Sequence, residues 1–142
     1  IKNISIGIAS TEGKCLIHTG GKSNTSPWGG QSAVFMDSMA EAGKSVVDAL
    51  DGNILFISVM NNLSVDCDCT ARPSAPDIHD IGILASTDPV ALDQACVDLI
   101  YQSEGAESMI RRIEGVGGED TLEHGEEIGL GNRAYKLVVI NE

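Results

Sequence analysis

The sequence has few basic residues and no long apolar run. Nine Lys and Arg residues stand against 21 Asp and Glu among 142 residues, which gives a formal net charge of −12. This acidic balance argues against nucleic acid or an anionic membrane surface as a partner. No apolar stretch is long enough to cross a bilayer. Hydrophobic residues are 42% and charged residues 21%, as expected for a folded globular chain rather than a disordered one.

Cysteines are also few, and their spacing excludes several common sites. The four are Cys15, Cys67, Cys69 and Cys96. A chain long enough to build a core needs no disulfide framework, so a reducing cytoplasm is the expected location. Neither a ferredoxin cluster motif nor a paired CxxC zinc ribbon is present. The chain lacks a starting Met and a basic, apolar leader, from which we expect a mature product or an excised piece.

Negative charge is concentrated in the second half of the chain. Residues 1–60 carry four basic and five acidic groups, whereas residues 61–142 carry five basic and 16 acidic groups. An acidic face of this kind keeps a protein soluble. It would also attract a cation or a basic partner.

Apolar spacing predicts a single α/β domain over residues 1–142, with a layered mixed sheet and flanking helices. The helix over residues 32–50 has a clear helical period, and the helix from residue 89 to about 102 follows a Ser-Thr-Asp-Pro start. Loops are expected over residues 20–30 and 61–77, short helices over 106–113 and 121–128, and strands over 4–9, 15–18, 54–59, 78–85 and 135–140.

The sharpest chemical feature is Asp66-Cys67-Asp68-Cys69. In an extended segment Cys67 and Cys69 project to the same face, where two thiolates can hold one zinc, iron or copper(I) ion. Asp66 and Asp68 project to the other face. Two ligands do not complete a site, so His18, His79, Asp80 or a partner chain would have to add the rest. The alternative is a loop with two ordinary thiols.

Two further residues have both a structural and a chemical interpretation. Asp88 is suited to cap the helix that begins at Pro89, and it could instead serve as a metal ligand or a base at the carboxyl end of a strand. His18 lies beside the Gly-rich loop, either as a rim histidine with its bonds satisfied or as a ligand.

These motifs resemble a prokaryotic family known as domain of unknown function 362, or uncharacterised iron–sulfur centre proteins. Residues 80–95, DIGILASTDPVALDQA, are the most specific part, and DCDC looks like the family's cysteine motif. Further matching segments are residues 2–7, 13–14, 122–123, 128–131 and 135–137, together with His18. The resemblance implies that this chain is the C-terminal portion of a longer protein. It lacks the family's ferredoxin-like insert, so no [4Fe–4S] cluster is expected within it, and the family supplies no assigned reaction.

Two functions therefore remain open. The first is a metal-binding domain of a redox-associated protein, with Cys67, Cys69, His18 and Asp88 as ligands and Asp66, Asp68 and Asp80 holding them in place. Its partners would be the missing N-terminal half, a redox protein or a second copy of the chain. The second is a non-catalytic interaction domain with an acidic docking face. A reactive thiol is a weaker third, because neighbouring aspartates raise a thiol pKa.

Overall fold

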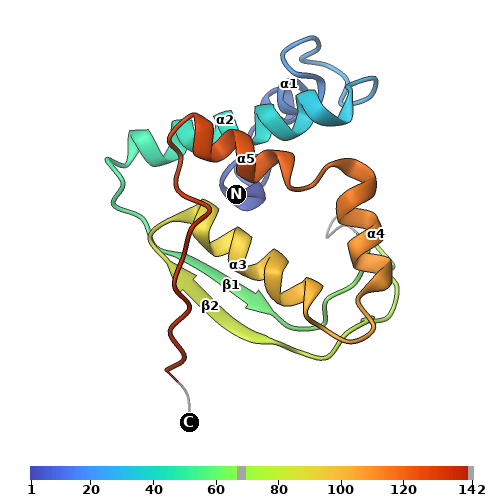
Figure 1. The fold of residues 1–142 in the computed structure, drawn as a ribbon. Coiled ribbons are helices and arrows are strands. Elements are labelled where there is room, and N and C mark those ends of the chain that lie inside the picture. Colours follow the sequence, from blue (N-terminus) through green and yellow to red (C-terminus); the bar gives the residue numbers. More distant parts are fainter. Residues whose placement is uncertain (67–69, 141–142) are drawn as a thin grey trace.

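A small antiparallel sheet forms the base of the molecule. The computed structural model describes residues 1–66 and 70–140, and in it β1 (Phe56–Met60) pairs with β2 (Gly82–Ser86). Helix α3 (Pro89–Tyr101) lies across one face of this sheet (Figure 1). Phe56 and Met60 point toward the helix and are buried, whereas Ile57 and Val59 alternate to the other face and are exposed.

Helices α1 (Thr11–Thr19), α2 (Ser32–Ala49) and α5 (Asp120–Glu127) form a second layer beyond α3 (Figure 1). Helix α2 packs against α1 and α5, and α5 also contacts α3. Helix α4 (Glu107–Val116) contacts the same helix α3. No helix among the described residues is long and apolar enough to cross a membrane.

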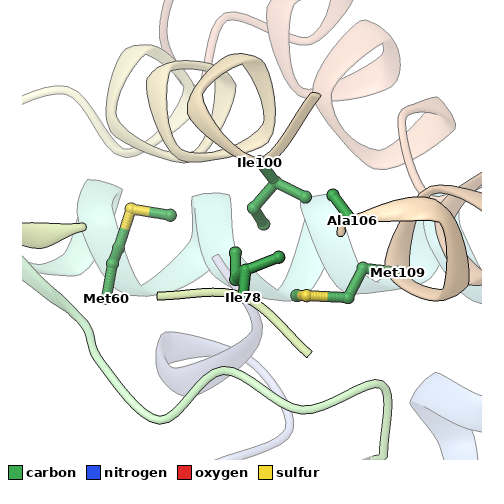
Figure 2. Packing of buried hydrophobic residues seen from close by; sticks show 5 residues of the cluster. All are labelled: Met60, Ile78, Ile100, Ala106 and Met109. Atoms are coloured by element: carbon green, nitrogen blue, oxygen red, sulfur yellow. The ribbon is translucent and has the colours of Figure 1, made fainter. Parts of the chain in front are cut away.

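Two buried clusters join these layers. The first gathers side chains from β1, the segment before β2, the end of α3 and the region of α4, as Figure 2 shows for Met60, Ile78, Ile100, Ala106 and Met109. The second, formed by Ile1, Val90, Leu122 and Leu130, joins the start of α3 to α5 and to both ends of the chain. Because the clusters draw on distant parts of the sequence, burying their apolar surface holds α3 at the centre of the fold.

The predicted α/β class is confirmed, and so are the main helices. Helix α2 and helix α3 occupy the predicted ranges to within two residues, and α4 and α5 lie where the two short helices are expected. The strands predicted over residues 54–59 and 78–85 are confirmed as β1 and β2, with shifted ends.

The strand predictions for the N-terminal segment are wrong. Residues 2–4 form a short 3-10 helix, η1 (Lys2–Ile4), and residues 5–8 turn. Ile1 and Ile4, three residues apart, both lie against Gly43 of α2, a packing that an extended strand would not allow. Residues 15–18 belong to α1, because the Ser10 hydroxyl accepts a bond from the Gly13 amide at 3.1 Å and starts a helix there.

The strand predicted over residues 135–140 is also absent from the described structure. This C-terminal segment leaves α5 and runs as an unpaired stretch of chain past the end of the sheet (Figure 1). Its apolar pattern is that of a strand, but a strand needs a neighbour to which it can hydrogen-bond.

Candidate functional site

The loop between β1 and β2 carries the cysteine motif. Cys67, Asp68 and Cys69 lie outside the described residues. Just before them, the Asp66 carboxylate accepts hydrogen bonds from the Ser74 amide and hydroxyl, both at 2.7 Å. These two bonds to Ser74 hold the pKa of Asp66 below its usual range. These bonds join residues 66 and 74, which lie on either side of the residues that the structure does not describe.

A second set of bonds closes the base of this loop. The Asp80 carboxylate accepts from the Asn62 amide at 2.8 Å, where Asn62 turns the chain with a φ of 49°. The Asp77 amide donates to the Leu63 carbonyl at 3.2 Å. Asp66 and Asp80 thus bind the loop's backbone, while their predicted role in holding metal ligands and the role of the cysteines stay predictions.

A polar hollow lies beside the base of the loop. It has a volume of about 780 Å³ and is lined by Asn62, Glu104 and the segment 76–80, which includes His79 and Asp80. Imidazole and carboxylate groups of this kind are potential ligands for zinc or iron. His79, Asp80 and Glu104 line this hollow.

His18 lies in the last turn of α1. Its Nδ1 is 2.7 Å from the Lys14 carbonyl, and its ring stacks on Phe35 of α2 with centroids 4.7 Å apart. Both contacts orient the ring at the junction of the two helices. The predicted metal-ligand role of His18 stays a prediction, since its described contacts are those of a packing residue.

Asp88 caps helix α3 and also binds the C-terminal segment. One carboxylate oxygen accepts from the Val90 and Ala91 amides at 2.9 Å, and the other accepts from the Asn132 amide at 2.8 Å. Gly131 lies directly against this carboxylate, so that a Cβ at position 131 would collide with it. The capping interpretation is confirmed, whereas the role of Asp88 as a metal ligand stays a prediction.

The described residues bring only part of the predicted set together. Asp66 and Asp80 belong to the β1–β2 loop, His18 to the α1–α2 pair, and Asp88 to the start of α3. Over residues 1–66 and 70–140, no three His, Cys, Asp or Glu side chains are grouped closely enough to hold a metal ion. The predicted ligands Cys67 and Cys69 lie outside these ranges.

Residues 1–98 match the model of a family described as Domain of unknown function (DUF362). The matched part covers more than half of the chain and contains the cysteine loop, His18 and Asp88. This chain belongs to the DUF362 family. Comparisons with curated proteins and with solved structures gave no match.

The DUF362 chain holds two other thiols away from the loop. Cys15 is buried in α1, and Cys96 is half-buried in α3; both are free. Burial raises the pKa of the Cys96 thiol, and a hydrogen bond with Ser58 partly opposes this effect. A raised pKa disfavours the thiolate form of Cys96, and the side chain packs against the first buried cluster.

Sequence reasoning missed a polar network on α3 of the DUF362 chain. Arg133 donates to Gln94 at 2.7 Å and to Glu119 at 2.9 Å, while Gln94 donates to Asp98 at 2.9 Å. The Tyr135 hydroxyl donates to the other Asp98 oxygen at 2.7 Å, which raises the pKa of Tyr135. Gln94 is buried, whereas the other polar residues of α3, Asp93 and Asp98, are half-buried. The sequence signal for this network was a polar residue, Gln94, among the apolar residues of α3. Its partner Arg133 lies 39 residues further along the chain.

Proposed function

We propose that this DUF362 chain is a metal-binding domain in which the thiolates of Cys67 and Cys69 hold a zinc or iron ion. The observation that carries the proposal is the pair of bonds from Ser74 to Asp66, the residue next to Cys67. Because these bonds tie residue 66 to residue 74, less conformational entropy would be lost when the cysteines between them bind an ion.

Groups near the loop can complete the coordination. His79 and Glu104 line the polar hollow at its base, and Asp80 is held there by its bond to Asn62. Bound by two thiolates and one or two of these groups, the ion would have a mixed sulfur, nitrogen and oxygen environment typical of zinc and iron. With an open coordination position it would serve as a Lewis acid or an electron carrier.

Metal content of anaerobically purified protein tests this function. We expect near-stoichiometric zinc or iron in the native chain and its loss in the Cys67→Ser/Cys69→Ser double variant. The matched control is Cys15→Ala/Cys96→Ala, which also removes two thiols and should keep the metal. A native chain that holds no metal after reconstitution with zinc and with ferrous iron would contradict the proposal.

Single variants then identify the other ligands. His79→Gln is expected to weaken zinc affinity at least tenfold, and His18→Gln and Asp88→Asn test the residues that the sequence singled out. Replacing a metal ligand lowers the affinity for the metal. Replacing a packing residue lowers thermal stability and leaves the metal affinity unchanged. Competition with a chromophoric chelator measures the affinity, and thermal unfolding of the metal-free protein measures the stability.

A second candidate function, a non-catalytic interaction domain, has its own supporting observation. The sheet face opposite α3 exposes Ile57, Val59 and Ile83 to 61%, 59% and 71%. Val59 pairs with Ile83 across the strands, so these side chains form one continuous apolar surface. Surfaces of this kind mark contacts with other proteins.

Sedimentation of the purified chain tests this alternative. An interaction surface should make the isolated chain self-associate, and Val59→Thr/Ile83→Thr should restore a monomer because threonine keeps strand propensity while removing apolar surface. Ser45→Thr, on an exposed part of α2, is the control. A native chain that stays monomeric at about 100 μM would count against the interaction domain, because exposed apolar surfaces self-associate at μM to mM concentrations.

A further inference from the structure

The C-terminal segment, residues 132–140, is held on α3 by polar bonds at its start. The Asn132 amide binds Asp88, the Arg133 guanidinium binds Gln94, and the Tyr135 hydroxyl binds Asp98. All three acceptors belong to α3 or its cap, so residues 132–135 run along that helix. We call this set of bonds the latch.

Beyond the latch, the segment changes character. Val138, Val139 and Ile140 are exposed to 65%, 78% and 90%, and within the described structure the backbone of residues 136–140 makes no hydrogen bond to other backbone groups. Branched apolar residues favour strands, and leaving several of them in water forgoes the free energy of burial. This end of the chain therefore has the composition of a strand without the neighbour that a strand requires.

The missing neighbour lies across a pocket of about 590 Å³. One wall of the pocket is β2, from Ile83 to Ser86; the second is α3, with Leu92 and Ala95; and the third is the segment itself, with Leu137, Val138 and Ile140. Since β2 pairs with β1 on one side, its other edge has no strand partner within the described part of the chain. The pocket separates an open strand edge from an unpaired apolar segment.

We propose that residues 136–140, which we call the strap, pair with the free edge of β2 as a third strand. The latch fixes the start of the strap on α3. Closure fills the pocket with the side chains that now line it. It pairs the open backbone of β2, and it turns a marginal two-stranded sheet into a three-stranded one. This inference does not rest on metal binding, because the pocket and the latch involve no residue of the β1–β2 loop.

Hydrogen exchange followed by mass spectrometry of the full chain tests the closure. We expect the β2 peptide, residues 81–86, to contain amides that exchange at least tenfold more slowly than in a chain ending after Tyr135. Three proline variants test the pairing: Leu137→Pro, Val138→Pro and Val139→Pro, each with the alanine variant as its control. Successive amides of an edge strand point alternately to the sheet and to solvent, so proline is tolerated only at alternate positions.

We therefore expect the effect on β2 exchange to alternate along the segment. Val138→Pro has the opposite effect on β2 protection to Leu137→Pro and Val139→Pro, whereas all three alanine variants keep the protection. Amides of α3 serve as the internal control for folding. Equal, rapid exchange of β2 in every variant, or equal loss with all three prolines, would overturn the third strand. Protection that rises with protein concentration would also overturn it, because it would come from the segment of a second copy.

Discussion

Aspartates hold backbone amides at two places in this molecule, with different consequences for the fold. At the start of α3, the Asp88 carboxylate caps the helix through partly buried bonds and reaches Asn132, 44 residues away, through an exposed bond. In the β1–β2 loop, Asp66 and Asp80 join residues eight and 18 apart through solvent-exposed bonds. The chemistry is the same, but only the first bond set joins a helix to a segment far away in the sequence. We therefore expect the Asp88 bonds to stabilise the fold and the loop bonds to shape the loop alone.

The largest effect is expected for Asp88→Ala. The change leaves three backbone amides without their acceptor and removes one of the three bonds that hold residues 132–135 on α3. We expect a loss of about 3 kcal/mol in the free energy of unfolding, measured by urea denaturation. Asp88→Asn, which keeps an acceptor oxygen for the helix amides, should lose about half as much. Equal losses in both variants would show that charge, not capping, stabilises this end of α3.

Gly131→Ala should have the next largest effect. A methyl group at this position would overlap the Asp88 carboxylate, so the segment or the cap must move. We expect a loss of about 2 kcal/mol in the free energy of unfolding. Gly115→Ala in α4 is the matched control, since nothing lies within 4 Å of a Cβ there. That variant should be neutral or more stable by up to about 1 kcal/mol, because alanine favours a helix.

A smaller effect is expected for Asp80→Ala in the loop. It removes one solvent-exposed bond to the Asn62 amide, and water can replace the lost acceptor. We expect a loss below about 1 kcal/mol in the free energy of unfolding. In contrast, amide exchange across residues 61–66 should accelerate. A global loss as large as that of Asp88→Ala would erase the distinction between the two sets of bonds.

The smallest effect on stability is expected for Asp66→Asn, and it depends on pH. Bonds from Ser74 lower the pKa of Asp66 in the folded state below the ordinary value of 3.8. The stabilisation is therefore present above pH 3.8 and is lost as the pH falls through the folded pKa. Urea unfolding of the native chain should show this acid-side loss, and the Asn variant should show less of it. Identical pH profiles would mean that the Asp66–Ser74 contact is absent in solution.

The helices and strands with local sequence signals could be predicted from the amino-acid sequence alone. Helix α2 has a helical apolar period over its whole length, and helix α3 has a capping Asp followed by Pro at its first position. The strands β1 and β2 were predictable as short apolar runs between polar loops. The candidate loop was equally readable, because two cysteines at a spacing of two residues and their flanking aspartates are visible in the chain.

The other features could not be predicted, because they depend on contacts with residues far away in the chain. The alternation of residues 4–9 suits a strand, but packing of Ile1 and Ile4 on α2 makes a turn. Gln94 reads as an ordinary helix residue until Arg133 reaches it. The last residues have the apolar pattern of a strand, and their state is set by whether the edge of β2 lies within bonding distance. A local pattern specifies what a segment can form, whereas the contacts available to it specify what it does form.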